Sequence, residues 1–384
     1  MSPSIALDEI MASKSGSVDP SKFPGEVFDL YSIPAFDSGH PEVVAGRAIG
    51  SAKQVVRPGD VLLSRIVPHI RRSWVVANGS GRRIIASGEW IVFRSDRVHP
   101  DYLRHVLVGD PFHAQFMNTV AGVGGSLLRA RPDHVGKIKI PLPPLAEQRR
   151  IAEVLDRAEV LRAKRRAALD QLDTLTQSIF LDLFGNPMTN ERDWPVSELQ
   201  DLACVERGKF TPRPRNDPSF YGGQFPFIQT GDISNCGGRL SSWTQTLNER
   251  GIAVSRSFQP GTIVIAIVGA TLGMTAILDA EVYCPDSVVG IQVQPNKAHA
   301  EYIERILRFW RPIFVAKAPE TARANINLET LRPLRVPNPP VSLQCEFASR
   351  VKVVERLKAT HRISLAKLDT LFAVLQHRAF RGEL

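Results

Sequence analysis

The sequence has few cysteines, and their spacing argues against the two frameworks that cysteines most often build. Four occur in 384 residues, with no Cys-x-x-Cys pair among them. Disulfide and zinc frameworks depend on close, paired spacings, whereas isolated cysteines are typical of reduced thiols. We therefore expect free thiols in a cytoplasmic protein at Cys204, Cys236, Cys284 and Cys345.

Long apolar runs are missing as well. No stretch of about 18 apolar residues, the length that a membrane-spanning helix needs, is present. The first residues lack the charged start and apolar centre of a signal peptide. Hydrophobic residues nevertheless make up 43% of the chain, enough for proper cores. The length of 384 residues predicts two or three domains, and no membrane partner is expected.

The motifs of several enzyme classes are absent too. Asn338–Val341 resembles the Asn-Pro-Pro-Tyr site of adenine methyltransferases, but valine replaces the aromatic residue that would hold a flipped base. Gly122–Ser126 is no dinucleotide fingerprint, because Leu127 stands where the third glycine is needed. No Asp or Glu is followed two positions later by the Lys of a common nuclease signature, and the nine histidines form no metal-ligand cluster. We expect neither a catalytic nor a metal site.

What the chain does have is an excess of positive charge. Lys and Arg number 48 against 39 Asp and Glu, which gives a net charge of +9 and a pI of about 9.6. The excess is spread along the chain without a polybasic tail. This balance favours a polyanionic partner such as nucleic acid, although a merely basic soluble protein would have the same composition.

The chain also repeats itself after about 196 residues. Ile140-Pro-Leu-Pro-Pro144 returns as Val336-Pro-Asn-Pro-Pro340, and Gln148 returns as Gln344. Leu172-Asp-Thr-Leu175 returns unchanged as Leu368-Asp-Thr-Leu371. Long-period repeats report duplicated architecture. Two copies are too few for a solenoid, so we predict a pseudo-twofold molecule of two globular parts and two helices, suited to a target with two halves.

The texture of the sequence divides the chain into five segments. Short β-like runs alternate with Gly, Pro and Asp turns in the globular parts, which indicates mixed α/β domains, while Gly and Pro vanish from the two helical parts. We predict a flexible arm at 1–20, a first domain at 21–143, a first helical spacer at 144–190, a second domain at 191–340 and a second helical spacer at 341–384.

Both helical segments carry a narrow apolar stripe at three-to-four spacing, which favours burial against one partner helix. We predict that the two helices pair antiparallel as a coiled coil; the alternative is that each packs on its own domain. Arg165 and His361 interrupt the stripes near the helix middles, and we hypothesise that they meet and fix the register. The other residues assigned to helix pairing or a subunit interface are Ile151, Leu155, Leu172, Leu175, Ile179, Val351, Val354, Leu368, Leu371 and Leu375.

In this order of segments the chain resembles the DNA-specificity subunits of type I restriction–modification systems. The resemblance spans nearly the whole length and rests on Pro141–Gln148, Pro226–Ile233 and Phe380–Leu384. It implies an α+β fold, two target-recognition domains that each read half of a split DNA site, and paired helices that act as a ruler. Gly208–Pro212 approximates a family motif opening the second domain, whereas the first domain lacks it. The two domains are therefore expected to read different half-sites.

Base edges are read mainly by Arg, Lys, Asn, Gln and His side chains. In the first domain the predicted DNA contacts are Arg65, His69, Arg71, Arg72, Arg129 and Arg131. In the second domain they are Lys209, Arg213, Arg215, Asn325 and Asn327. Asn325 and Asn327 match Arg129 and Arg131 after the 196-residue shift, and because Arg favours guanine and Asn adenine, the replacement suggests different half-sites.

The resemblance also implies partners. Double-stranded DNA, a pair of methylation subunits and the restriction subunits are expected, with S-adenosylmethionine and ATP bound by those partners and no cofactor on this chain. Two other function classes stay open: a helical scaffold that does not read DNA, and an autonomous methyltransferase or nuclease with unfamiliar motifs. Salt-dependent affinity and a sequence preference would distinguish a DNA reader from a scaffold.

Overall fold

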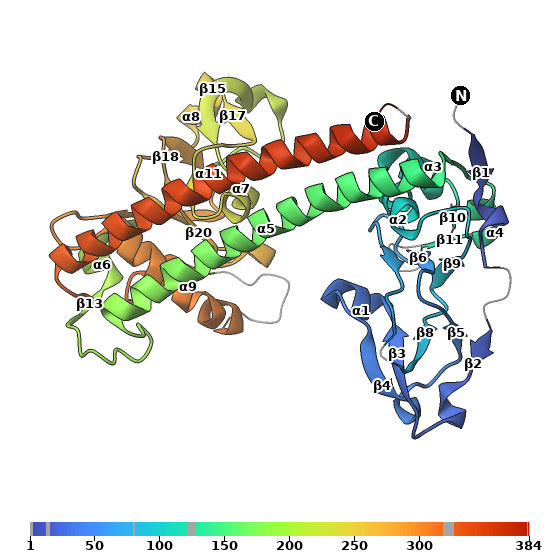
Figure 1. The fold of residues 1–384 in the computed structure, drawn as a ribbon. Helices are drawn as coiled ribbons and strands as arrows, with labels where there is room; N and C mark the ends of the chain where they lie inside the picture. Colours follow the sequence, from blue (N-terminus) through green and yellow to red (C-terminus); the bar gives the residue numbers. More distant parts are fainter. Residues whose placement is uncertain are drawn as a thin grey trace. The chain divides into compact units, whose positions relative to one another are not determined.

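A computed structural model describes residues 3–12, 16–79, 81–121, 128–317, 326–381 and 383. The chain forms two compact units (Figure 1). Unit 1 contains Met1–Arg166 and Ile363–Leu384, and unit 2 contains Ala167–Arg362. Two long helices, α5 (Leu145–Phe184) and α11 (Val341–Ala379), each contribute one half to either unit.

Unit 1 is a mixed α/β domain with the start of α5 and the end of α11. One sheet has the strand order β2-β5-β8-β3-β4 and another the order β7-β6-β9, while β1 pairs with β12 and β10 with β11. The strands are β1 (Ser4–Ala6), β2 (Ser17–Val18), β3 (Val27–Tyr31), β4 (Glu42–Ala45), β5 (Lys53–Val55), β6 (Val61–Ser64), β7 (Ser73–Val75), β8 (Arg83–Ala86), β9 (Trp90–Phe93), β10 (Val120–Ala121), β11 (Arg129–Ala130) and β12 (Lys139–Pro141). Its shorter helices are α1 (Ile33–Ser38), α2 (Pro100–Val108), α3 (Asp110–Met117) and α4 (Pro132–Gly136).

The structure contradicts the prediction of a flexible arm at residues 1–20 for the described residues 3–12. Ser4–Ala6 pairs antiparallel with Lys139–Pro141. Ile5, Leu7 and Ile10 are fully buried in the core of unit 1. The small and polar residues around them made the segment look unstructured. Burial of each of these three apolar side chains stabilises the attachment of the segment to the domain by on the order of 1.5–3 kcal/mol.

Unit 2 repeats this plan with one five-stranded and one four-stranded sheet. Its sheets have the orders β14-β22-β19-β20-β16 and β17-β15-β21-β18, and β13 pairs with β23. The strands are β13 (Val196–Glu198), β14 (Ala203–Arg207), β15 (Tyr221–Phe227), β16 (Arg239–Leu240), β17 (Gln245–Leu247), β18 (Arg256–Phe258), β19 (Ile263–Ala266), β20 (Thr275–Leu278), β21 (Val282–Cys284), β22 (Val288–Val293) and β23 (Arg335–Pro337). Its shorter helices are α6 (Leu199–Leu202), α7 (Thr230–Asn235), α8 (Glu249–Ala253), α9 (Ala300–Lys317) and α10 (Leu328–Leu331).

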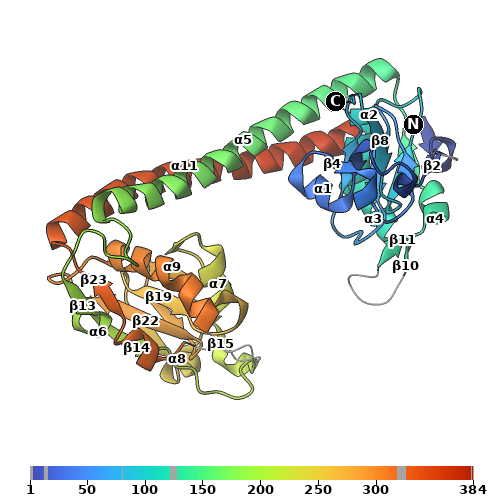
Figure 2. The same ribbon diagram turned by 90° about the horizontal axis from the view of Figure 1, so that it is seen from below.

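Helix α5 forms because forty residues pass without Gly or Pro between two clear boundaries. Pro143 and Pro144 lead into it, and Gly185 ends it with a left-handed φ of 74° and a hydrogen bond from its N–H to the Leu181 carbonyl (2.9 Å). Figures 1 and 2 show α5 and α11 side by side and antiparallel within each unit. Among the described residues no helix has the combined length and apolarity of a membrane span. The predicted α+β fold with two mixed domains and paired antiparallel helices is confirmed.

The repeated glutamines Gln148 and Gln344 make matching hydrogen bonds in the two units. The Gln148 amide oxygen accepts a hydrogen bond from the His99 N–H (2.7 Å), and the Gln344 oxygen accepts one from the His299 N–H (2.8 Å). Gln148 is 1% exposed and Gln344 is fully buried. In both units this buried amide also donates to the carbonyl of the proline five residues earlier. Each glutamine therefore fastens the start of a long helix to its own domain.

The residues predicted for the helix pair fall into two groups. Those packed inside a unit are Ile151, Leu155 and Leu375 in unit 1 and Ile179, Val351 and Val354 in unit 2, with Leu172 and Leu368 partly buried. The long helices thus pack both on each other and on the domains, for example where Phe372 of α11 joins Leu155 of α5 in the core of unit 1.

Two predicted residues do not belong to the seam. Leu175 and Leu371 are 44% and 48% exposed, so helix pairing does not bury them, and only their alternative assignment to a subunit interface remains a prediction. Their three-to-four spacing puts them on the apolar face of the helix, but the surface buried between the two helices is narrower than that face. Arg165 and His361 are partly buried and lie in different units, and their meeting stays a prediction.

Candidate nucleic-acid interface

Two arginines of the first predicted set share one carboxylate in unit 1. Arg65 follows β6 and Arg129 lies in β11, and both pair with Glu89 at 3.2 Å. Backbone pairing brings them together, because the Ala130 N–H donates to the Arg65 carbonyl (2.8 Å). Burial alone would raise the pKa of the Glu89 carboxyl, but the hydrogen bond from Arg129 and the charges of both arginines lower it. The cluster keeps one net positive charge and unused guanidinium donors.

The other two predicted arginines of the loop after β6 form ion pairs with other carboxylates. Arg71 donates to Asp110 (2.6 Å) and to the Val108 carbonyl (3.1 Å). Arg72 grips Asp37 through two hydrogen bonds of 3.0 and 3.1 Å. These contacts tie the loop to α3 and α1. His69, between them and β6, is exposed. The structure therefore gives Arg71 and Arg72 structural ties in addition to any contact with DNA.

Unit 2 has a similar cluster in the loop after β14. Arg213 and Arg215 both pair with Asp286, Arg213 at 3.4 Å. The Arg213 guanidinium also donates to the Phe210 carbonyl (3.1 Å), above an aromatic group in which Phe210 packs against Phe227 at a ring separation of 5.0 Å. Lys209 is exposed at the start of the same loop. As in unit 1, a single carboxylate orients two guanidinium groups.

Only one of the two asparagines predicted to contact DNA in the second domain lies within the described residues. Asn325 lies outside the described residues. Asn327 is the N-cap of α10, and its side-chain oxygen accepts from the Thr330 N–H (2.9 Å) and hydroxyl (2.8 Å). Arg131, its match in the repeat, is exposed at the N-cap position of α4. The sequence did carry a signal for the capping role, since Asn directly before a short helical run is a favoured N-cap.

His105, Asp156 and Glu159 lie close enough together to hold a metal ion, within the described ranges of the chain. Arg104 already occupies both carboxylates, at 2.5 Å to Asp156 and 2.9 Å to Glu159. Burial, followed by the charge of Arg104, lowers the pKa of the His105 imidazole, and its Nε2 lies 2.8 Å from Asp156. This geometry is an ion-pair network that joins α2 to α5.

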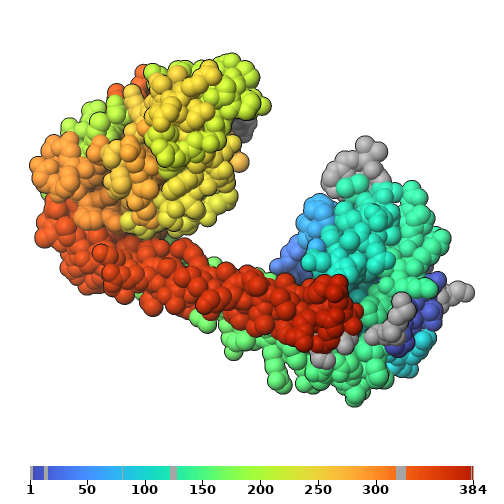
Figure 3. All heavy atoms as spheres, turned by 90° about the horizontal axis from the view of Figure 1, so that it is seen from above, coloured from blue at the N-terminus to red at the C-terminus, as the bar shows by residue number. Residues whose placement is uncertain are grey.

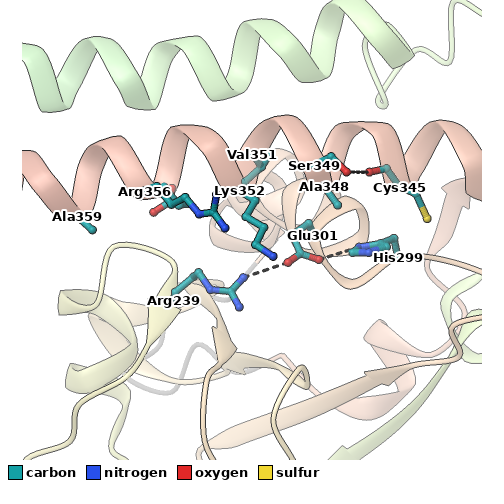
Figure 4. A pocket seen from close by; sticks show the side chains of 11 residues that line it. Arg239, His299, Glu301, Cys345, Ala348, Ser349, Val351, Lys352, Arg356 and Ala359 are labelled. Carbon is teal, nitrogen blue, oxygen red and sulfur yellow. Dashed lines mark hydrogen bonds and ion pairs between the residues drawn. The ribbon is translucent and has the colours of Figure 1, made fainter.

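A groove of about 560 Å³ lies between α11 and the domain of unit 2 (Figure 4). On its floor Glu301 pairs with His299 (2.7 Å) and Arg239 (3.0 Å). Burial alone would raise the pKa of Glu301, but His299 and then Arg239 bring it to about 2. Lys352 and Arg356 reach into the groove from α11. The groove therefore combines apolar residues of α11 with the basic side chains of Arg239, Lys352 and Arg356.

Comparison with protein families matches residues 191–368 to the type I restriction modification DNA specificity domain. The chain is 25% identical over 291 residues to the type I restriction enzyme EcoBI specificity subunit of Escherichia coli. That alignment covers 64% of this chain and 58% of the relative, so the chain matches somewhat less than two thirds of the relative's length.

Solved structures share the fold. A type I restriction–modification S subunit from M. genitalium has a TM-score of 0.61 at 12% identity, covering 98% of this chain and 96% of that one. A chain from a study of complex assembly and conformational transition in the type I R-M system has a TM-score of 0.57 at 22% identity, covering 100% and 98%. Residues 191–368 therefore belong to the family of type I restriction modification DNA specificity domains, and the chain as a whole shares its fold with the solved structures.

Proposed function

We propose that the chain selects a split sequence in double-stranded DNA for adenine methylation and restriction by partner subunits. Unit 1 reads one half of the site and unit 2 the other. The duplicated tie through Gln148 and Gln344 carries this proposal, because it means that two related domains are mounted in the same way on two related helices. A reader with two equivalent mounts suits a target with two halves.

The chemistry of the two clusters supports contact with DNA. Glu89 and Asp286 each hold two arginines in place, so each cluster presents oriented guanidinium donors with a net positive charge. A guanidinium can bind phosphate, or guanine through two hydrogen bonds. Holding the side chains beforehand lowers the entropy that binding must overcome. The different surroundings of the two clusters support different half-sites.

The helices are proposed to set the gap between the half-sites. Forty helical residues extend roughly 60 Å, and a duplex advances about 3.4 Å per base pair. A ruler of this length is long enough to hold two readers about one helical turn of DNA apart. The clusters and the helix pair supply binding and spacing, and we assign no catalytic step to this chain. Its predicted place is the cytoplasm, with S-adenosylmethionine and ATP bound by the partners.

Exposed leucines on the helices support docking of two copies of one partner, which we identify as the methylation subunit, with restriction subunits added to that complex. Leu161 and Leu357 occupy matching positions of the repeat, as do Leu175 and Leu371, and all four are exposed. Unit 1 thus presents Leu161 and Leu371, and unit 2 presents Leu357 and Leu175. Figure 3 shows the outer face of α11, in red, uncovered by either domain.

A change of these leucines to aspartate tests the docking. Leu161→Asp with Leu371→Asp should remove one of two methylation subunits from the purified complex, because the introduced charges would have to be desolvated in the interface. Val43→Asp, at an exposed valine of β4, is the matched control and should leave the complex intact. Retention of both subunits by the double variant would contradict this docking surface.

Methylation mapping across a genome tests the function as a whole. Cells carrying the chain and its partners are compared with cells that lack only this chain. The expected result is loss of adenine methylation at one motif made of two short half-sites around an unspecified gap. Persistence of every methylated motif, despite active partners, would refute DNA selection and favour a scaffold that does not read sequence.

A further inference from the structure

Ion pairs join the two long helices within each unit, and in unit 1 Asp369 of α11 pairs with both Arg162 and Arg166 of α5, the latter at 3.3 Å. In unit 1, Arg162 of α5 donates to Asp369 of α11 at 2.6 Å. In unit 2, Lys358 of α11 lies 2.7 Å from Asp173 of α5. Ion pairs within one helix, such as Arg350 with Glu346, are indifferent to how the helices are aligned. Only contacts between helices carry information about their register.

The two pairs are related by the repeat. Arg162 matches Lys358, and Asp173 matches Asp369 as the second residue of the repeated Leu-Asp-Thr-Leu. On each helix the base comes first and the acid follows eleven positions later, at 162 and 173 and again at 358 and 369. In an antiparallel pair the base of one helix then meets the acid of the other, at both places and in a single register. The aspartate of the repeated Leu-Asp-Thr-Leu thus supplies the acid at both places.

Lys358 is buried and Arg162 is partly buried, so the loss of their carboxylate partners would be costly. The Lys358 side chain is 2% exposed and that of Arg162 is 19% exposed. The Arg162 guanidinium also lies over the ring of Phe372, 4.4 Å from its centre. Lys358 has Glu355 as a second partner at 2.7 Å. A buried cation that loses its carboxylate is strongly unfavourable, whereas an exposed one is nearly indifferent.

A shift of the helices by one heptad, about 10 Å, would destroy this match. The apolar spacing alone tolerates such a shift, because leucines recur along both stripes. Counting along the antiparallel register, Lys358 would then face Phe180 in one direction or Arg166 in the other. After such a shift the buried ammonium would lose its partner on α5 and keep only Glu355 of its own helix as a counter-charge.

We infer that the Arg162–Asp369 and Lys358–Asp173 pairs set the register at which α5 and α11 pair. The acidic and basic residues act as positioning residues for the helices rather than as DNA contacts. If the helices define the gap between half-sites, the same pairs hold that gap constant; this consequence rests on the proposed function.

The test exchanges the charges of one pair and measures register directly. Nitroxide labels are placed on the full chain at Val353 and Ser178, which are exposed and stand opposite each other in this register, after replacement of the exposed cysteines Cys204 and Cys345 by serine. Pulsed electron paramagnetic resonance should give one narrow distance. Lys358→Glu should broaden it or shift it by about 10 Å, one heptad of helix. Lys358→Glu with Asp173→Lys should restore it.

Two further variants separate register from folding. Lys367→Glu reverses an exposed lysine of the same helix and should leave the distance narrow. Lys358→Met with Asp173→Leu removes the buried charge and should stay folded, yet show a second distance. The inference fails if the charge exchange does not restore the distance, if Lys358→Glu behaves like Lys367→Glu, or if the apolar variant keeps one distance.

Methylation mapping with the same variants keeps the two proposals apart. A shifted label distance with an unchanged gap in the methylated motif would leave the register role standing and refute the ruler. A chain that directed no methylation at all would refute the proposed function, while the label distances would still decide the role of the ion pairs.

Discussion

Replacement of Gln344 by leucine should loosen unit 2 alone. Leucine fills similar space but removes the acceptor of the His299 N–H (2.8 Å) and the donor to the Pro339 carbonyl (2.8 Å). Both groups would lose this partner at a part-buried or buried place, at about 1–3 kcal/mol each, so the free energy of unfolding should fall by roughly 2–6 kcal/mol. Gln148→Leu should do the same in unit 1, where the glutamine accepts from the His99 N–H and donates to the carbonyls of Pro143 and Arg97.

Hydrogen–deuterium exchange with peptide resolution is the suitable assay, because it reports each unit separately. A loss of about 2 kcal/mol corresponds to roughly 30-fold faster exchange through unfolding. Gln344→Leu should accelerate peptides of unit 2, and Gln148→Leu those of unit 1. Gln177→Leu, at an exposed glutamine of α5, is the control and should change neither. Equal acceleration of both units, or a loss below about 0.5 kcal/mol, would refute the reasoning.

Two further predictions concern DNA reading and pH. Neutralising Arg129 and Arg131 should change methylation at one half-site only, and Asn327→Ala at the other; equal effects on both halves in sequencing of methylated sites would contradict a two-reader protein. The pKa of Glu301 is about 2 in the folded chain against 4.5 ordinarily, so its contribution to stability is present above pH 4.5 and lost as the pH falls toward 2. Glu301→Gln should flatten the decline of the melting temperature over that range; an unchanged slope would mean that His299 and Arg239 do not stabilise the carboxylate in solution.

Several sequence predictions depended on contacts that local pattern does not reveal. The first residues looked like a loose arm because their neighbours are small and polar, yet Ile5 pairs with Ile140, far along the chain, and is buried. Leu175 and Leu371 fit the apolar stripe but stay exposed, since periodicity gives the face of a helix and not the width of its contact. Asn327 had the right chemistry for a base contact, and its amide oxygen is engaged in a helix cap.

The sequence by itself determined the duplicated plan and the two long helices. Helix formation depends on local spacing and on the absence of Gly and Pro, and the repeat of Leu-Asp-Thr-Leu is legible without coordinates. Only the tertiary structure decided which residue each repeated side chain pairs with or hydrogen-bonds to. Asp173 and Asp369 find their cations on the other helix, and Gln148 and Gln344 find the His99 and His299 N–H groups on the domains. Those partners are remote in sequence, and folding the whole chain is what brings their charges and donors within bonding distance.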